Sequence, residues 1–198
     1  MIKSPFDYVS FDELQRIYPL EKIVFYGAIL FFTCYIIANL YTDIKHRRTS
    51  NLQHTISLVL AICFFNYMHE GSFIVLIVML IGLIFGLILE KMNTSSPGDT
   101  KMFVVMSVWI VSFSTENLIQ QTLVFCIITY AIQLGFAWIS WVQKKGLFNA
   151  LNEQKEQLIM LLTPGAPLGK EVIFENWPGA VNMCLGAILT LLAGGILI

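Results

Sequence analysis

A polar hexapeptide between two apolar runs decides the fold of this chain, and it reads Ser96-Pro97-Gly98-Asp99-Thr100-Lys101. Apolar residues dominate positions 73–89 before it and positions 102–110 after it. A carboxylate at the end of a membrane segment is energetically costly, which makes Asp99 a candidate functional residue. Such an acid matters most where a second acid can meet it, and Asp43 is the candidate partner.

The composition predicts an all-α integral membrane protein. The 198 residues are 57% hydrophobic and 13% charged, whereas typical soluble domains are about 45–50% apolar and about 25% charged. Several apolar runs reach or approach the roughly 20 residues that a helix needs to cross a bilayer. These runs cover residues 23–41, 73–89, 118–142 and 180–198. The net charge of −1 and the lack of a basic patch argue against nucleic acid as a partner.

The apolar pattern predicts a bundle of about six transmembrane helices. The expected spans cover residues 23–41, 52–68, 73–89, 99–114, 118–142 and 178–198. The loops at about 43–54, 90–101 and 143–176 hold three, two and four of the 12 Lys and Arg residues, and the two short connections between them hold none. Because basic loops stay in the cytoplasm, we expect both termini on the extracytoplasmic side. Residues 1–22 would form an extracytoplasmic or interfacial segment, and residues 23–198 one membrane domain.

This topology brings the two acids to one membrane face. Asp43 follows the first span and Asp99 begins the fourth, so both are expected on the cytoplasmic side. Two facing carboxylates share a proton, because like charges about 3 Å apart cannot both ionise cheaply. The ionised acid then activates a water, and the protonated acid donates to the carbonyl oxygen of a peptide bond. Position alone leaves a second reading open, in which the acids cap helices or pair with Lys45 or Lys101.

The residues around both acids follow recognisable patterns. Residues 43–51 read Asp-Ile-Lys-His-Arg-Arg-Thr-Ser-Asn, and residues 96–102 read Ser-Pro-Gly-Asp-Thr-Lys-Met. Pro178 and Gly186 stand eight positions apart at the start of the last expected span. These stretches resemble D-x-R-x-x-x-I-(P/S)-N, G-x-G-D-x-K-(L/M) and P-x-x-P-x-L-x-x-G, which are motifs of the type IV prepilin peptidase family of GxGD membrane aspartyl proteases. The chain departs from these motifs where Ser96 replaces the first glycine, Thr49-Ser50 replaces Ile-Pro, and Val181 replaces the second proline.

The resemblance implies an aspartyl endopeptidase of the inner membrane with Asp43 and Asp99 as its catalytic dyad. Such enzymes remove the leader peptide of type IV prepilins or pseudopilins at the cytoplasmic face. Expected partners are therefore that substrate, membrane lipids and a pilus or type II secretion assembly. No cofactor is implied, and methyltransferase activity is not expected, because the chain lacks the cysteine-paired domain of the larger members. The alternative class is a non-enzymatic assembly or transport protein whose acids are structural or carry protons.

Several residues near the acids are candidate supporting groups. Gly98 is expected to turn the chain tightly beside Asp99, and Pro97 to fix the approach to that turn. Ser96 is small enough for close approach but visits positive φ less freely than glycine does. Lys101 either tunes Asp99 or marks the membrane boundary. Asn51 either caps the second span or positions the loop that holds Asp43.

Four further residues are candidates for contact with a substrate. Arg47 and Arg48 are expected to set the topology and to contact lipid headgroups, with substrate binding as the alternative. Pro178 is a candidate substrate contact. Asn182 is either a peptide-binding group or a partner in an interhelical hydrogen bond. The three histidines follow no metal-ligand spacing, so no metal site is expected.

Overall fold

The computed structural model describes residues 19–46, 50–91, 96–114, 117–149, 151–152, 155 and 179–194. Its main helices are α2 (Pro19–His46), α3 (Asn51–Met68), α4 (Ile74–Lys91), α5 (Pro97–Ser112), α6 (Leu118–Lys145) and α8 (Gly179–Ala193). These described ranges contain no strand. The all-helical class predicted from the sequence is therefore confirmed. The predictions for residues 1–18 lie outside the described residues.

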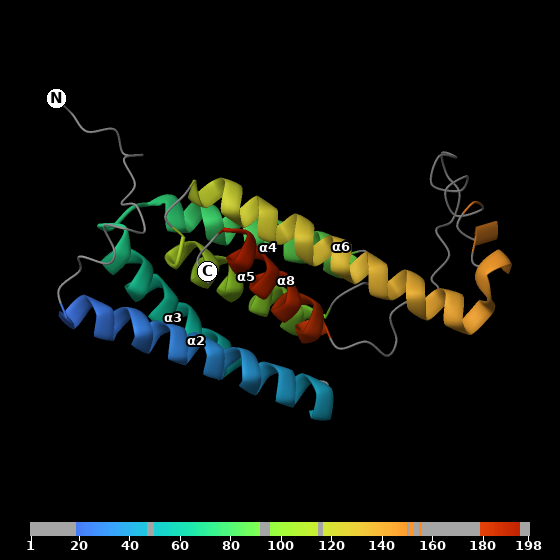
Figure 1. Cartoon of the computed structure of the whole chain (residues 1–198), viewed down its shortest axis with the longest axis horizontal. Coiled ribbons are helices and arrows are strands. Elements are labelled where there is room, and N and C mark those ends of the chain that lie inside the picture. Colours follow the sequence, from blue (N-terminus) through green and yellow to red (C-terminus); the bar gives the residue numbers. More distant parts are fainter. Residues whose placement is uncertain are drawn as a thin grey trace.

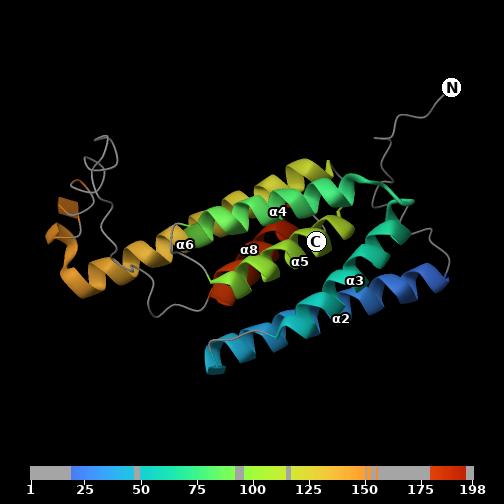
Figure 2. The ribbon, with the colours of Figure 1, turned by 180° about the vertical axis from the view of Figure 1, so that it is seen from behind.

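Helix α5 is the centre of the bundle. It contacts α3, α4, α6 and α8, and 12 of its 16 residues are buried. Figure 1 shows α2 and α3 on one side of α5 and α4 and α6 on the other, with α8 beside it, and Figure 2 shows the same order from behind. The helix that begins with the polar hexapeptide is thus the one around which the others pack.

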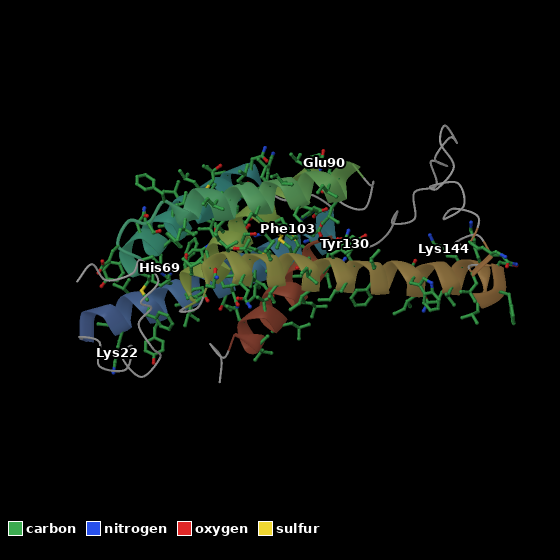
Figure 3. The ribbon with its side chains drawn as sticks, turned by 90° about the horizontal axis from the view of Figure 1, so that it is seen from above. Lys22, His69, Glu90, Phe103, Tyr130 and Lys144 are labelled. Atoms are coloured by element: carbon green, nitrogen blue, oxygen red, sulfur yellow. The ribbon has the colours of Figure 1, made fainter. Side chains whose placement is uncertain are left out.

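Successive helices run in opposite directions, which sorts their ends into two groups. Figure 3 shows Lys22 and His69 at one end of the bundle, and Glu90 and Lys144 toward the other. At the first end the His69 ring lies 3.2 Å from the carbonyl oxygen of Val111. At the second end the Thr100 hydroxyl donates to Glu90 Oε2 at 3.1 Å. We call this second end, where α2 and α4 finish and α3, α5 and α8 begin, the site end.

The outward faces of the helices are apolar. Large exposed hydrophobic side chains occur along α2, α3, α4, α6 and α8, with Leu30 66% exposed and Ile127 63% exposed. Two described helices are long and apolar enough to cross a membrane, over Lys22–His46 and Leu118–Lys145. Shorter apolar helices cover Ile74–Glu90 and Gly179–Ala193.

The helices extend further into the polar segments than the sequence predicted. Helix α2 continues through His46 and α3 begins at Asn51, so the bounds predicted for the first loop are wrong. Similarly, α5 begins at Pro97, before Asp99, and α6 continues to Lys145. The physical reason is that backbone hydrogen bonding does not stop where apolar residues stop; a helix ends where a cap or a breaker satisfies its terminal groups.

Candidate catalytic site

The two acids singled out by the sequence are both buried at the site end. Asp43 lies in the last turn of α2 and Asp99 in the first turn of α5, and each residue is 8% exposed. Asp99 lies within the electrostatic reach of Asp43, although burial is the larger influence on the Asp99 carboxyl group. The topology therefore brings together two carboxyl groups from helices that are well separated in the chain.

The start of α8 lies between these two acids. The backbone N–H of Ala180 donates to Asp43 Oδ2 at 3.0 Å. On the neighbouring residue, a Cβ added to Gly179 would lie 2.5 Å from the carboxyl carbon and both carboxyl oxygens of Asp99. Because adjacent Cα atoms are about 3.8 Å apart, both carboxyl groups lie against the same short piece of backbone. Only glycine leaves room for Asp99 here.

Ser96 holds the Asp99 side chain from the other direction. The Ser96 backbone N–H donates to Asp99 Oδ2 at 2.7 Å, and its hydroxyl donates to the same oxygen at 2.9 Å. In return, the Asp99 N–H donates to Ser96 Oγ at 3.4 Å, which completes a capping box with Pro97 in the first turn. The pattern Ser-x-x-Asp before an apolar run is itself a signal for such a box, and this reading was missed at the sequence level.

This cap corrects two expectations about the hexapeptide. Gly98 lies in the first turn of α5, so it continues the helix and does not turn the chain. Ser96 has extended backbone, with φ −92° and ψ 162°. The position that glycine occupies in the family motif therefore needs no positive φ in this chain, and serine adopts it without strain.

The N-termini of α5 and α8, and not basic side chains, are the positive groups beside the two acids, although Asp43 itself lies at the C-terminal end of α2. Asp99 lies at the N-terminus of α5, and Asp43 accepts a bond from the N-terminus of α8. Helix N-termini carry partial positive charge and favour anions. Lys45 donates instead to the Tyr41 hydroxyl at 2.7 Å. In the described part of the chain, neither Lys45 nor Lys101 forms the ion pair that position alone left open.

The other residues predicted to belong to the site lie at different positions in the structure. Lys101 Nζ donates to Asn51 Oδ1 at 2.8 Å, which ties the start of α5 to the start of α3. Asn51 is not the cap of α3, as one reading predicted, because Ser50 precedes it as the N-cap. Asn182 is 2% exposed in the first turn of α8. Arg47, Arg48 and Pro178 lie outside the described residues.

A small cavity opens beside Asp99. Residues of α4, α5, α6 and α8 line it, among them Thr100, Gln133, Gly179 and Met183. Its volume of about 10 Å³ is the space of one water molecule. The cavity thus places room for a small polar molecule in contact with one of the two acids.

A polar face of α2 leads from Asp43 into the bundle. Tyr35, Asn39 and Asp43 are spaced four residues apart, which puts them on the same face of the helix. The Tyr35 hydroxyl lies 2.8 Å from His54 Nδ1, and Asn39 is fully buried. The polar residues at this spacing in an apolar helix were a usable signal that the sequence reading did not exploit.

Comparisons with protein-family models, with curated proteins and with solved structures find no match for this chain. Its function must therefore be inferred from its own residues. Among the described residues, no group of three or more His, Cys, Asp or Glu side chains could hold a metal ion. The site therefore consists of two buried carboxyl groups on one piece of backbone, with a water-sized cavity beside Asp99.

Proposed function

We propose that this chain is a membrane-embedded aspartyl endopeptidase. Its substrate would be a type IV prepilin or a pseudopilin, from which it removes the leader peptide at the cytoplasmic face of the membrane. The observation that carries the proposal is the convergence of Asp43 and Asp99, both buried, on the Gly179–Ala180 backbone. The likeness of the sequences around these acids to the prepilin peptidase motifs supplies the substrate class.

The proposed mechanism uses the two carboxyl groups as one unit. Both carboxyl groups lie against the Gly179–Ala180 backbone, and two neighbouring acids can share one proton because like charges disfavour double ionisation. The ionised acid removes a proton from a water molecule, for which the cavity beside Asp99 has the right volume. The protonated acid donates to the carbonyl oxygen as water attacks. The tetrahedral intermediate then collapses, and the peptide C–N bond breaks as the leaving nitrogen takes up the proton that the first acid removed from water. The second acid regains its proton from the hydroxyl that becomes the product carboxyl group. Because coupled acids titrate as a pair, the base is not assigned to either one.

The apolar outer surface supports a location in the inner membrane with about six spans. Exposed hydrophobic side chains cover five of the helices around α5, where lipid tails would meet them at no cost. The basic loops adjoin the site end, since α2 and α6 finish there with Lys45 and Lys144 in their last turns. Under the positive-inside rule the site end faces the cytoplasm. That is the side on which a prepilin leader would be presented.

One observation keeps a second function under consideration. The capping box of Asp99 and the bond from Ala180 N–H to Asp43 are contacts that purely structural acids also make. In this alternative the chain is a non-enzymatic assembly or transport protein. The two functions differ in the effect of replacing either aspartate by asparagine. If the acids are structural, the replacement lowers folding and abundance. If they are catalytic, it removes cleavage alone.

Leader removal in cells tests the proposed function. The full chain is co-expressed with a tagged prepilin in a host without its own prepilin peptidase. We expect a product of increased mobility, whose new N-terminus lies just before the hydrophobic helix of the pilin. A substrate that stays intact beside a normally inserted chain, across several prepilins and pseudopilins, contradicts the proposal.

The native cysteines test the membrane location separately. Cys34 and Cys63 are exposed in the middle of α2 and α3, whereas Cys126 and Cys184 are buried. Because maleimides react with the thiolate and no water reaches the bilayer core, we expect none of the four to react in intact vesicles. All four should react once the chain is unfolded in detergent. The Ser72→Cys variant should react at position 72 in intact vesicles, without unfolding. Rapid reaction of Cys34 or Cys63 in vesicles would mean that these faces meet water.

A further inference from the structure

Ser96 forms three hydrogen bonds with a single residue, Asp99. Its backbone N–H and its hydroxyl both donate to Asp99 Oδ2, and its Oγ accepts from the Asp99 N–H. An ordinary capping box uses only the last bond and a return bond from the N-cap N–H. The bond from the hydroxyl to the carboxylate is additional, and a glycine at this position could not make it.

These bonds make the two oxygens of Asp99 unequal. In the part of the chain that the structure describes, Oδ2 accepts both Ser96 bonds and Oδ1 accepts none. The carboxyl group is also confined by the Gly179 backbone. Asp43 has the same asymmetry, because its described bond, from Ala180 N–H, goes to Oδ2. Among the described residues, each acid is thus held through its Oδ2.

We propose, on the basis of the function proposed above, that Ser96 is a positioning residue for the aspartyl dyad. Its hydroxyl fixes the Asp99 carboxyl group by Oδ2, so that Oδ1 is the oxygen that exchanges a proton with water or with Asp43. The serine in place of the first motif glycine is then a gain of function at this site. Restoring the glycine would weaken the enzyme.

A merely structural role for Ser96 would be that of a helix cap, and substitution separates the two roles. Glycine is nearly as good an N-cap as serine, within a few tenths of a kcal/mol, and it keeps the backbone N–H that bonds Oδ2. Ser96→Gly therefore removes the hydroxyl with little effect on α5. Ser96→Thr keeps a hydroxyl at the same place. Ser72→Gly is the matched control, because the Ser72 hydroxyl accepts from Ile74 N–H at the start of α4, and the Ser72 N–H bonds the carbonyl of His69, at the end of the bundle opposite the site end.

Kinetics of prepilin cleavage by the purified full chain give the first test. Hydrogen bonds to charged groups are the strong ones, and we expect Ser96→Gly to lower kcat about 10-fold with KM within about 2-fold of wild type. Ser96→Thr should recover most of this loss, and Ser72→Gly should leave both constants unchanged. Wild-type kcat in Ser96→Gly, or an equal loss in Ser96→Thr, would overturn the proposal.

A second readout does not depend on cleavage. Dicyclohexylcarbodiimide is a lipid-soluble reagent that modifies protonated carboxyl groups, and mass spectrometry reports the modified residue. Removing a donor to the Asp99 carboxylate disfavours its charged form, so we expect several-fold more modification at Asp99 in Ser96→Gly than in wild type. If this increase occurs but neither wild type nor any variant cleaves a prepilin, Ser96 does position the Asp99 carboxyl group, and the proposed peptidase function fails. If wild type cleaves but neither kcat nor modification changes in Ser96→Gly, the positioning role fails alone.

Discussion

We expect Asp43→Asn and Asp99→Asn each to abolish the proposed leader removal, with a loss of at least about 10³-fold, and to leave the abundance of the inserted chain near wild type. General acid–base catalysis contributes about 10²–10⁴-fold, and either change removes the shared proton that both acids need. The double variant should be no worse than either single one, because residues that act as a unit are non-additive. Cleavage is followed by the mobility shift of the prepilin, and abundance by immunoblotting of membranes.

The structure explains why these two variants should fold. Asn is the same size as Asp, and its side-chain oxygen can still accept the Ala180 N–H at position 43 and the Ser96 donors at position 99. Glu90→Gln is the matched control, since Glu90 is an acid at the same end that bonds Thr100 and not the dyad. Processing by either Asn variant at the wild-type rate would rule out the dyad, and loss of the inserted chain would favour structural acids.

Gly179→Ala should impair the proposed cleavage without unfolding the chain, and we expect a loss of about 10²-fold or more in kcat/KM. The new Cβ would lie 2.5 Å from the Asp99 carboxyl group, so that group must move. A misplacement of about 1 Å at reacting groups is enough to cost about 10²-fold. Alanine otherwise favours a helix over glycine by about 1 kcal/mol. The melting temperature in detergent should therefore change little.

Gly135→Ala is the control for this change, because nothing lies within 4 Å of the added Cβ in α6. It should retain wild-type cleavage and stability. Wild-type activity in Gly179→Ala would show that the close approach of α8 to Asp99 is unimportant for function. A large fall in melting temperature would show instead that Gly179 serves packing alone.

The sequence was sufficient for the helices and for the pairing of Asp43 with Asp99 as the candidates. Both follow from local pattern: apolar runs give the helices, and their alternation along the chain puts the end of the first span level with the start of the fourth. Helix bounds were less accurate, because Ser50 and Ser96 cap helices inside the polar segments that were read as loops.

The contacts between helices that form the site could not be predicted from the sequence. Gly179 and Ala180 were not singled out, because nothing in a Gly-Ala pair indicates that residues of α2 and α5 will pack on it. Gly98 was predicted to turn the chain because it belongs to the GxGD-like motif. The capping pattern that begins at Ser96 instead places Gly98 in the first turn of α5. Tertiary contacts decided the first point, whereas the second was decided by a local capping box.

Cleavage by the purified chain in lipid vesicles tests the central claim most directly. Wild type and the Asp43→Asn/Asp99→Asn double variant are incubated with one purified prepilin, and the mass of the product defines its N-terminus. We predict a single cut between the basic leader and the hydrophobic helix, by wild type alone. An intact substrate after incubation with correctly inserted wild type, or the same cut by the double variant, would contradict the assignment of Asp43 and Asp99 as a proteolytic dyad.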